Sequence, residues 1–208
     1  MRKLLLASDG GFLIKEGYAV LGVPKEKAHI AYITDASKGE SNHEYLELHK
    51  GAMAEAGYRF TEMDVEGRSA EELRRMFAGK TVLHVEGGNS FYLLKAVRAS
   101  GFEEVVREIL AQGVPYVGTS AGAYLACPTI EVSTWGPKKK DHYGVTDFRA
   151  LNLVPFLVRA HYKDELADLI REKARHASCP VRILRDGQGI LVEGDSYRFV
   201  GTGEEVFL

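Results

Sequence analysis

Residues 114–126 have the sequence Val114-Pro115-Tyr116-Val117-Gly118-Thr119-Ser120-Ala121-Gly122-Ala123-Tyr124-Leu125-Ala126. The apolar run, the G-x-S-x-G pentapeptide and the helix-compatible segment predict a strand, a sharp turn and a helix in succession. Small residues around Ser120 let the strand reverse closely and leave the serine hydroxyl exposed on a strained turn. The amide of Ala121 then lies at the positive end of the helix, where an oxyanion would form. The alternative is a glycine-rich turn in which Ser120 only caps the helix.

Apolar runs rich in Val, Ile and Leu alternate with longer segments of helical periodicity around this stretch. Strands are predicted at 2–8, 28–33, 58–64, 81–85 and 114–117, and helices at 43–57, 69–78, 90–98 and 102–112. This alternation predicts right-handed βαβ units, and therefore a flavodoxin-like three-layer α/β/α fold with a mainly parallel sheet. Later strands are predicted at 153–158, 181–185, 189–193 and 197–200. Turn signals between them predict an antiparallel edge or hairpin near the C-terminus, and we expect residues 1–208 to form a single domain.

Composition excludes several classes of function. The chain has 208 residues, is 45% hydrophobic and carries a net charge of −2, so it offers no basic face for nucleic acid. The cationic run Lys138-Lys139-Lys140 predicts a solvated loop. No apolar stretch reaches 18 residues, and the opening segment predicts a strand rather than a signal peptide or a membrane span. Cys127 and Cys179 lack metal-site spacing, which predicts reduced thiols, a cytoplasmic location and no bound metal.

Catalytic partners for Ser120 are expected beyond the carboxyl ends of the strands, where open α/β sheets gather their functional residues. His161 follows the predicted strand 153–158, and Asp186 follows the predicted strand 181–185. A serine nucleophile needs a base for its proton, and the imidazole needs an acid that fixes its tautomer. These three residues supply one group of each kind. Their order, Ser then His then Asp, differs from that of α/β-hydrolases and argues against that fold.

Alternatives to this trio exist for each partner. His161 could be a core or interface histidine, and Asp186 could serve only in an Asp-Gly turn, with Glu86 or Glu131 as the acid instead. His142, in the polar loop 136–147, is the alternative base. His84 lies within a strand pattern and is expected to be packed. The remaining histidines are expected at the surface: His29, His43, His49 and His176.

The segment Glu86-Gly87-Gly88-Asn89-Ser90 follows a predicted strand and opens a predicted helix. Two glycines let the backbone approach a bound group closely, and a helix N-terminus favours negative charge. The amide of Gly88 is therefore a candidate second donor to an oxyanion, beside that of Ala121. A phosphate-binding loop is the alternative, although the sequence is neither G-x-G-x-x-G nor a Walker A motif.

Five segments together resemble the dipeptidase E family of serine peptidases. They are Val85–Leu94, Gly118–Ala123, Ala126–Ile130, Leu153–Phe156 leading to His161-Tyr162, and Asp186-Gly187-Gln188. The resemblance implies a class I glutamine amidotransferase-like fold in which serine replaces the amidotransferase cysteine. It also implies that Ser120 is the nucleophile, His161 the general base, Asp186 the orienting acid, and Gly88 and Ala121 the oxyanion-hole donors. Such enzymes need no metal or organic cofactor, are cytoplasmic, and cleave very short peptides, with a preference for N-terminal aspartate in the best-known branch.

The chain departs from that family in two places that bear on specificity. Trp135 stands where an acidic side chain is expected, and Lys163–Leu166 replaces a glycine-rich loop that contains arginine. We expect Glu86 and Glu131 to accept the substrate ammonium group, with Asn89 and Trp135 also contacting the substrate. Arg159, Lys163 and Arg171 are the candidate cations for an aspartyl side chain.

The expected function is hydrolysis of dipeptides or similarly small amides by a monomer or homodimer that needs no cofactor. The alternatives are another amide or ester hydrolase of the same fold, such as a cyanophycinase-like enzyme, and a non-catalytic protein that binds small molecules.

Overall fold

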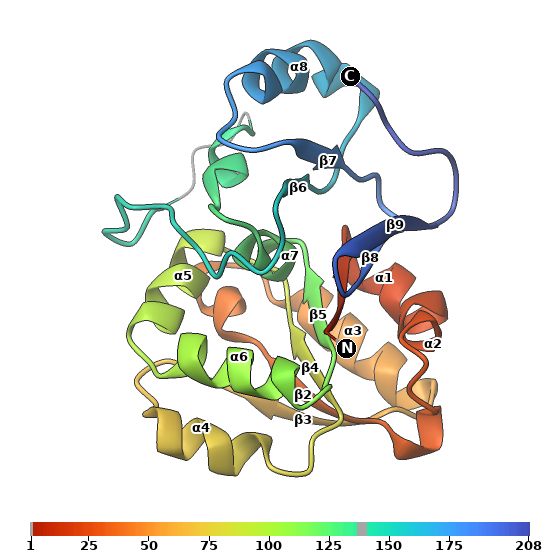
Figure 1. Cartoon of the computed structure of the whole chain (residues 1–208), viewed down its shortest axis with the longest axis vertical. Helices are drawn as coiled ribbons and strands as arrows, with labels where there is room; N and C mark the ends of the chain where they lie inside the picture. Colours follow the sequence, from red (N-terminus) through yellow and green to blue (C-terminus); the bar gives the residue numbers. More distant parts are fainter. Residues whose placement is uncertain (1, 137–140) are drawn as a thin grey trace.

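The computed structural model describes residues 2–136 and 141–208, and its centre is a seven-stranded sheet (Figure 1). The strands lie in the order β3-β2-β4-β5-β1-β8-β9. Their bounds are β1 (Lys3–Ala7), β2 (His29–Ile33), β3 (Arg59–Met63), β4 (Val82–Val85), β5 (Tyr116–Thr119), β8 (Gln188–Glu193) and β9 (Ser196–Gly201). The first five are parallel, whereas β8 runs antiparallel to both β1 and β9. The predicted α/β fold with a mainly parallel sheet and a closing hairpin is therefore confirmed.

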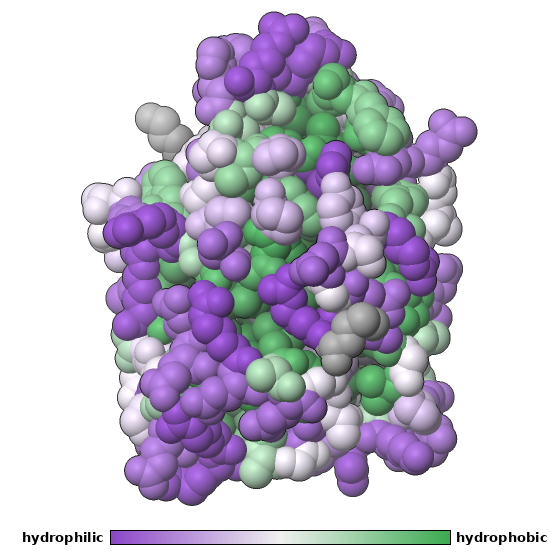
Figure 2. Space-filling view, in the orientation of Figure 1, coloured by the Kyte–Doolittle hydropathy of each residue, from purple (hydrophilic) through white to green (hydrophobic). Residues whose placement is uncertain are grey.

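Helices cover both faces of this sheet. The larger ones are α3 (Glu44–Glu55), α4 (Ala70–Phe77), α5 (Ser90–Arg98), α6 (Phe102–Ala111) and α7 (Ala121–Ala126), whereas α8 (Ala167–Arg175) lies away from this sheet. Local chemistry explains where two of them begin: Ser69 and Glu72 form a reciprocal capping box at α4, and the Asn89 side chain accepts from the amides of Phe91 and Tyr92 at α5. Figure 2 shows hydrophilic side chains over α4 and α8 on this side of the molecule.

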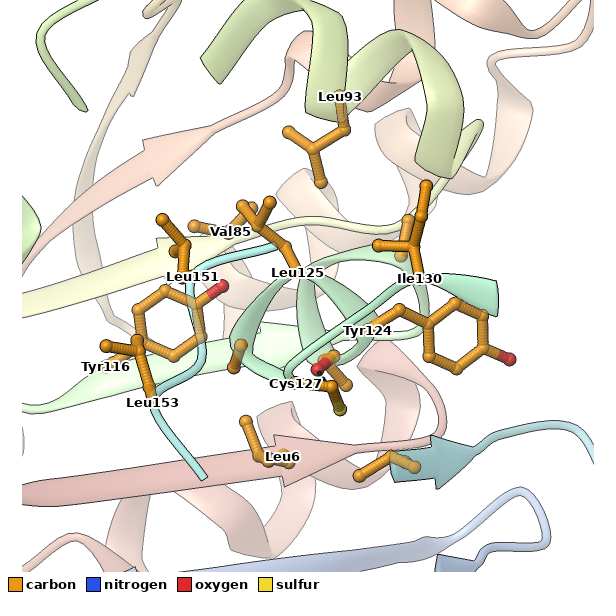
Figure 3. Packing of buried hydrophobic residues seen from close by; sticks show 14 of the residues in the cluster. Leu6, Val85, Leu93, Tyr116, Tyr124, Leu125, Cys127, Ile130, Leu151 and Leu153 are labelled. Atoms are coloured by element: carbon orange, nitrogen blue, oxygen red, sulfur yellow. Dashed lines mark hydrogen bonds between the residues drawn. The ribbon is translucent and has the colours of Figure 1, made fainter. Parts of the chain in front are cut away.

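The sheet separates two apolar cores because alternate residues of each strand point to opposite faces. Leu4 and Leu6 of β1 join one core, which includes the apolar sides of α4, α5, α6 and α7. Figure 3 shows a part of this core, where Leu6 of β1, Leu93 of α5 and Leu125 of α7 lie. Leu5 and Ala7 join the other, which includes Leu46 and Met53 of α3. Both faces of the sheet are thus buried against apolar side chains, which explains the continuous apolar runs of its strands.

The region after α7 differs from the prediction. The predicted strand at 153–158 is only β6 (Leu157–Arg159), and that at 181–185 is only β7 (Val181–Ile183). These two strands pair in parallel as a separate two-stranded sheet, with α8 between them in sequence. In Figure 1 this small sheet and α8 lie above the main sheet. Two prolines, Pro155 and Pro180, lack amide donors and stand just before the strands, which shortens both.

Two other stretches complete the description. Residues after β1 form consecutive helical turns that the sequence analysis did not predict, namely α1 (Gly10–Phe12), η1 (Leu13–Gly17) and α2 (Tyr18–Val20). The predicted solvated loop at Lys138-Lys139-Lys140 lies outside the described residues. Within the described ranges, no helix combines the length and the apolar character needed to cross a membrane.

Candidate active site

Ser120 lies on a sharp turn between β5 and α7, and its backbone has φ 47° and ψ −105°. Both glycines of the pentapeptide are required by close backbone contacts. A Cβ at Gly118 would lie 2.5 Å from the carbonyl of Gly122, and a Cβ at Gly122 would lie 2.0 Å from the Val85 oxygen. The Ser120 amide donates to the Ala7 carbonyl at 3.0 Å, which ties the turn to β1. The predicted strand, strained turn and helix are confirmed.

The structure brings Ser120, His161 and Asp186 together at the carboxyl ends of the strands. Nε2 of His161 lies 3.0 Å from the Ser120 Oγ, and Nδ1 lies 2.6 Å from an Asp186 oxygen. The histidine side chain is 45% exposed and the aspartate 61%, so both open to solvent. The hydrogen bond from His161 lowers the pKa of Asp186, which keeps its carboxylate ionised. A serine, a histidine and an aspartate from three segments far apart in sequence are thus in hydrogen-bond contact.

A serine that the sequence analysis missed contacts two of these three residues. Ser8 directly follows β1 and is fully buried. Its hydroxyl donates to Asp186 and accepts from the His161 amide, each at 2.9 Å. The next residue, Asp9, accepts from the Gly187 amide at 2.6 Å. No motif marks Ser8 in the sequence; its position at a strand end was the only available signal.

The glycine loop after β4 packs directly against Ser120. A Cβ at Gly87 would lie 3.2 Å from the Cβ of Ser120. The Gly87 amide donates to the Glu86 carboxylate at 2.6 Å, and its carbonyl accepts from the Tyr45 hydroxyl at 3.1 Å. Gly88 has φ 138°, a conformation that favours glycine, and a Cβ there would lie 2.5 Å from the Ala36 oxygen. Both the amide and the carbonyl of Gly87 are therefore hydrogen-bonded, and the loop has no room for a side chain at Gly88.

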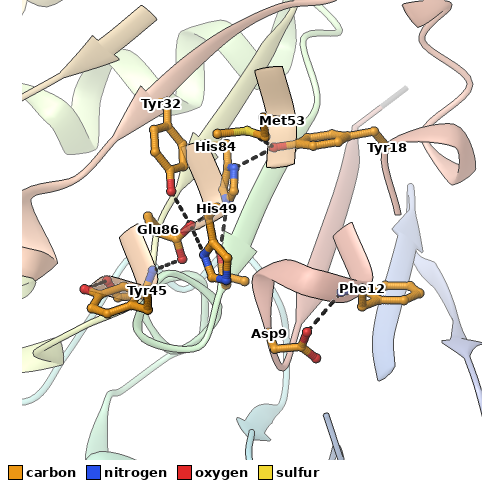
Figure 4. Close-up of polar contacts among 11 residues, drawn as sticks. Asp9, Phe12, Tyr18, Tyr32, Tyr45, His49, Met53, His84 and Glu86 are labelled. Carbon is orange, nitrogen blue, oxygen red and sulfur yellow. Dashed lines mark hydrogen bonds and ion pairs between the residues drawn. The ribbon is translucent and has the colours of Figure 1, made fainter. Parts of the chain in front are cut away.

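Glu86 is the centre of a buried polar network behind the loop (Figure 4). It accepts from the Tyr32 hydroxyl at 2.5 Å, and Nδ1 of His49 lies 3.2 Å from the same oxygen. Burial raises the pKa of Glu86, but the hydrogen bond from His49 and the nearby imidazoles outweigh it and lower the pKa overall. For His49, burial lowers the pKa, and its bond to Glu86 reverses that effect, so the pKa is raised. Glu86 is thus an ionised carboxylate with partners within the protein.

The histidine predictions have mixed outcomes. His84 is packed as predicted: burial lowers its pKa to about 4, and its ring nitrogens contact the hydroxyls of Tyr18 and Thr119. The prediction that His49 is an ordinary surface residue was wrong, because its side chain is only 23% exposed and pairs with Glu86. His142, the alternative base, stacks on Phe91 with ring centroids 3.9 Å apart, so the ring beside Ser120 is that of His161.

A cavity of about 620 Å³ opens in front of the serine. Its described lining includes Asp9, Tyr45, His49, Glu86, Gly88 and His161, and no arginine or lysine is among those described lining residues. Asn89 does not belong to the lining; its side chain caps α5 and donates to the carbonyls of Gly39 and Asp141.

Three residues expected to bind substrate lie elsewhere in the structure. The Glu131 carboxylate accepts from the Ser178 amide and hydroxyl, and Trp135 is packed in the apolar core at 5% exposure. Arg159 is 9% exposed and donates to the Tyr124 hydroxyl at 3.2 Å. These three side chains therefore do not line the cavity, contrary to the expectation from the sequence. Contacts made in and beside η4 (Glu131–Thr134) and β6 hold them elsewhere.

Comparison with known proteins gives a consistent result. The sequence profile described as Peptidase family S51 matches residues 14–200. Peptidase E from Streptomyces coelicolor is 31% identical over 211 residues, which cover 94% of this chain and 82% of that protein. An uncharacterized peptidase from Pasteurella multocida is 29% identical over 200 residues, covering 94% and 96% of the two chains.

Solved structures extend the likeness to the whole fold. A Listeria monocytogenes protein described as a candidate peptidase E has a TM-score of 0.84 at 24% identity, covering 98% of this chain and all of the other. A peptidase from an acI-B1 Actinobacterium has a TM-score of 0.70 at 15% identity, with 97% and 88% covered.

Proposed function

This chain belongs to peptidase family S51 and is a serine peptidase, and from that premise we propose that it hydrolyses dipeptides and similarly short peptides. In this proposal Ser120 is the nucleophile, His161 the general base and Asp186 the acid that orients the base. The observation that carries it is the bridging position of the His161 ring, which contacts the Ser120 hydroxyl on one side and the Asp186 carboxylate on the other.

The proposed reaction proceeds through an acyl-enzyme. The Ser120 oxygen attacks the carbonyl carbon of the scissile peptide bond while Nε2 of His161 takes the hydroxyl proton. The C–N bond then breaks, and the imidazolium returns that proton to the leaving amine. A water molecule, deprotonated by the same nitrogen, hydrolyses the ester and releases Ser120. Asp186 holds the proton on Nδ1 throughout, which leaves Nε2 available as the base.

The transient oxyanion needs hydrogen-bond donors close to the serine. We assign this role to the amides of Ala121, at the start of α7, and Gly88. Support for the first comes from its place directly after the nucleophile on the strained turn. Support for the second comes from the packing of the Gly87-Gly88 loop against Ser120.

The cavity supports short substrates without a strong preference for aspartate. Selection of an aspartyl side chain calls for a cation, preferably an arginine that binds the carboxylate in a bidentate manner. Arg159 is enclosed against Tyr124, and Arg171 pairs with Asp168 at 2.7 Å. We therefore propose small neutral N-terminal residues as substrates, with at most a modest preference for Asp. We further place the enzyme in the cytoplasm, as a one-domain monomer or homodimer that works without a cofactor.

Two measurements on the purified protein test this function. A dipeptide panel gives kcat/KM for each N-terminal residue, and a phosphonate probe for active-site serines reports covalent labelling by intact mass. We expect dipeptide hydrolysis and labelling of the wild type, and neither in Ser120→Ala. Labelling without dipeptide cleavage would favour another hydrolase of this fold, and the absence of both would favour a binding protein. Asp-Xaa substrates that exceed every neutral one by about 100-fold would contradict the proposed specificity.

A further inference from the structure

The end of β1 contacts every member of the proposed triad. The Ala7 carbonyl accepts from the Ser120 amide at 3.0 Å. The hydroxyl of the next residue, Ser8, accepts from the His161 amide and donates to the Asp186 carboxylate, each at 2.9 Å. The Ser8 amide donates to the Gln188 carbonyl at 2.9 Å, so the serine is itself held by the first residue of β8. One strand end thus serves as the common support for three segments that are far apart in sequence.

The base and the acid need such a support because both side chains are exposed. His161 has φ 55°, a left-handed conformation that is uncommon for a residue with a side chain, and it follows the three-residue strand β6. Asp186 lies in the short connection between β7 and β8 and is 61% exposed. Exposed side chains on turns populate several rotamers unless hydrogen bonds select one. The Ser8 hydroxyl selects the rotamer in which one Asp186 oxygen, Oδ1, also faces Nδ1 of His161.

A serine hydroxyl suits this place because it donates and accepts at the same time. Ser8 is fully buried, and its hydroxyl is the acceptor that the His161 amide has in this fold. Asp9 strengthens the same support from the other side, since its carboxylate accepts from the Gly187 amide at 2.6 Å. The backbone directly after Asp186 is therefore tied to residues 8 and 9.

We propose that Ser8 is a positioning residue of the peptidase, which holds the His161–Asp186 pair in register with Ser120. This inference rests on the proposed function, because it assumes that those three residues perform the chemistry. Ser8 itself makes no contact with the reacting atoms; it acts through the carboxylate of Asp186 and the backbone of His161.

The test compares Ser8→Ala with a matched control, Ser100→Ala. The Ser100 hydroxyl also donates to one group, the Val97 carbonyl, and accepts from one amide, that of Phe102, but it lies between α5 and α6. We expect Ser8→Ala to lower kcat by about 10- to 100-fold, because small misplacement of catalytic groups has effects of this size. KM should change by less than about twofold, and Ser100→Ala should leave both constants near wild type.

A double-mutant cycle separates positioning from a general structural effect. In an Asp186→Ala background the pair that Ser8 holds no longer exists, so adding Ser8→Ala should lower kcat further by less than about threefold. If Ser8→Ala lowers kcat by the same factor in the wild type and in the Asp186→Ala variant, the proposal is overturned. A Ser8→Ala variant with the kcat and KM of Ser100→Ala would also overturn it. Circular dichroism and thermal unfolding establish that each variant is folded.

The rate of labelling by the phosphonate probe provides the same comparison without a peptide substrate. If the wild type labels at Ser120 but cleaves no dipeptide, the proposed substrate is wrong, and the labelling rates of the Ser8 variants still decide the present inference. If Ser120→Ala is inactive while Ser8→Ala retains the full rate, the proposed function stands and the role of Ser8 is refuted.

Discussion

Two pairs of a carboxylate and an imidazole contribute to the cavity in front of Ser120, one through His161 alone and one through both His49 and Glu86, and they differ in exposure. In the pair His161–Asp186 the side chains are 45% and 61% exposed, whereas in His49–Glu86 they are 23% and 2% exposed. The second nitrogen of His161 faces the Ser120 hydroxyl, while the ring of His49 packs so closely on Gly10 that a Cβ there would lie 2.4 Å from it. The open pair is accessible to solvent and faces the Ser120 hydroxyl, as the proposed proton transfer requires. The closed pair fixes the glycine loop, because Glu86 also binds the Gly87 amide.

The open pair and its nucleophile should govern catalysis with little influence on stability. We expect Ser120→Ala and His161→Ala each to lower kcat by about 10⁴- to 10⁶-fold, since members of a triad act as a unit. Thermal unfolding should stay near wild type. Kinetics on a dipeptide substrate measure the loss, with Ser100→Ala as the control. A Ser120→Ala enzyme that retains more than about a tenth of the activity would rule out the mechanism.

Asp186 should matter almost as much, although it touches no substrate atom. In Asp186→Asn the amide favours the wrong tautomer of His161, so kcat should fall by up to about 10⁴-fold. Asp195→Asn, in the exposed turn between β8 and β9, is the matched control and should be silent. Nearly normal kcat in Asp186→Asn would transfer the orienting role to another group.

A substitution in the glycine loop should have the next largest effect on kcat. A Cβ in Gly88→Ala would clash with the Ala36 carbonyl, which displaces the proposed oxyanion donor. We expect kcat to fall by about 10²- to 10³-fold with less change in KM. Gly113→Ala is the control, because Gly113 also has a positive φ, of 89°, but a Cβ there meets nothing within 4 Å. An unchanged kcat would leave Gly88 as a structural turn.

The closed pair should show the opposite balance of effects. Glu86→Gln leaves His49, Tyr32 and the Gly87 amide without their buried ionised acceptor, so the free energy of unfolding should fall by about 3 to 5 kcal/mol. The remaining folded enzyme should keep activity within about tenfold of wild type, since Glu86 acts through the Gly87 amide. Chemical denaturation and kinetics at low temperature measure the two quantities. A variant that is fully stable but inactive would assign Glu86 to catalysis.

The smallest effect concerns pH. The pKa of His49 is raised in the folded protein. Its pair with Glu86 therefore stabilises the fold fully at a pH below the pKa of an unfolded histidine, and this stabilisation is lost as pH rises through the pKa of the folded state. The pKa of Glu86 is lowered, so the stabilisation from this carboxylate is lost at acid pH, as pH falls below the usual pKa range of a carboxyl group. As pH rises from 6 to 9, the free energy of unfolding of the wild type should therefore fall relative to that of His49→Gln, whose amide does not titrate, by a measurable amount of up to about 1 kcal/mol. The same dependence of the free energy of unfolding on pH in the two proteins would contradict this.

Local patterns predicted the main sheet well because its strands are buried on both faces. The runs around β1, β2, β4 and β5 are continuous and apolar, and the helices between them follow a clear period. The same patterns placed Ser120 on its turn, because three small residues in five reflect real backbone contacts. His161 and Asp186 were located from strand ends alone, and the structure brings both to Ser120.

Residues whose position depends on distant packing were not predictable in the same way. Ser8 and His49 carry no motif, and their partners lie far along the chain at Asp186 and Glu86. The predicted substrate residues Glu131 and Arg159 lie in the region after α7, where short strands depend on tertiary contacts. Strand ends in the sequence located the three candidate catalytic residues, whereas the residues that support them depend on the fold.

The position of β1 between β5 and β8 has a consequence for protein synthesis. β1, Ser120 and His161 all leave the ribosome before Asp186 and the β8–β9 hairpin that adds to the far side of β1. A nascent chain that has already exposed its serine therefore lacks the strand that anchors Ser8 through Gln188. We expect peptidase activity to arise only when this hairpin docks, so an unfinished chain does not hydrolyse peptides beside the translating ribosome.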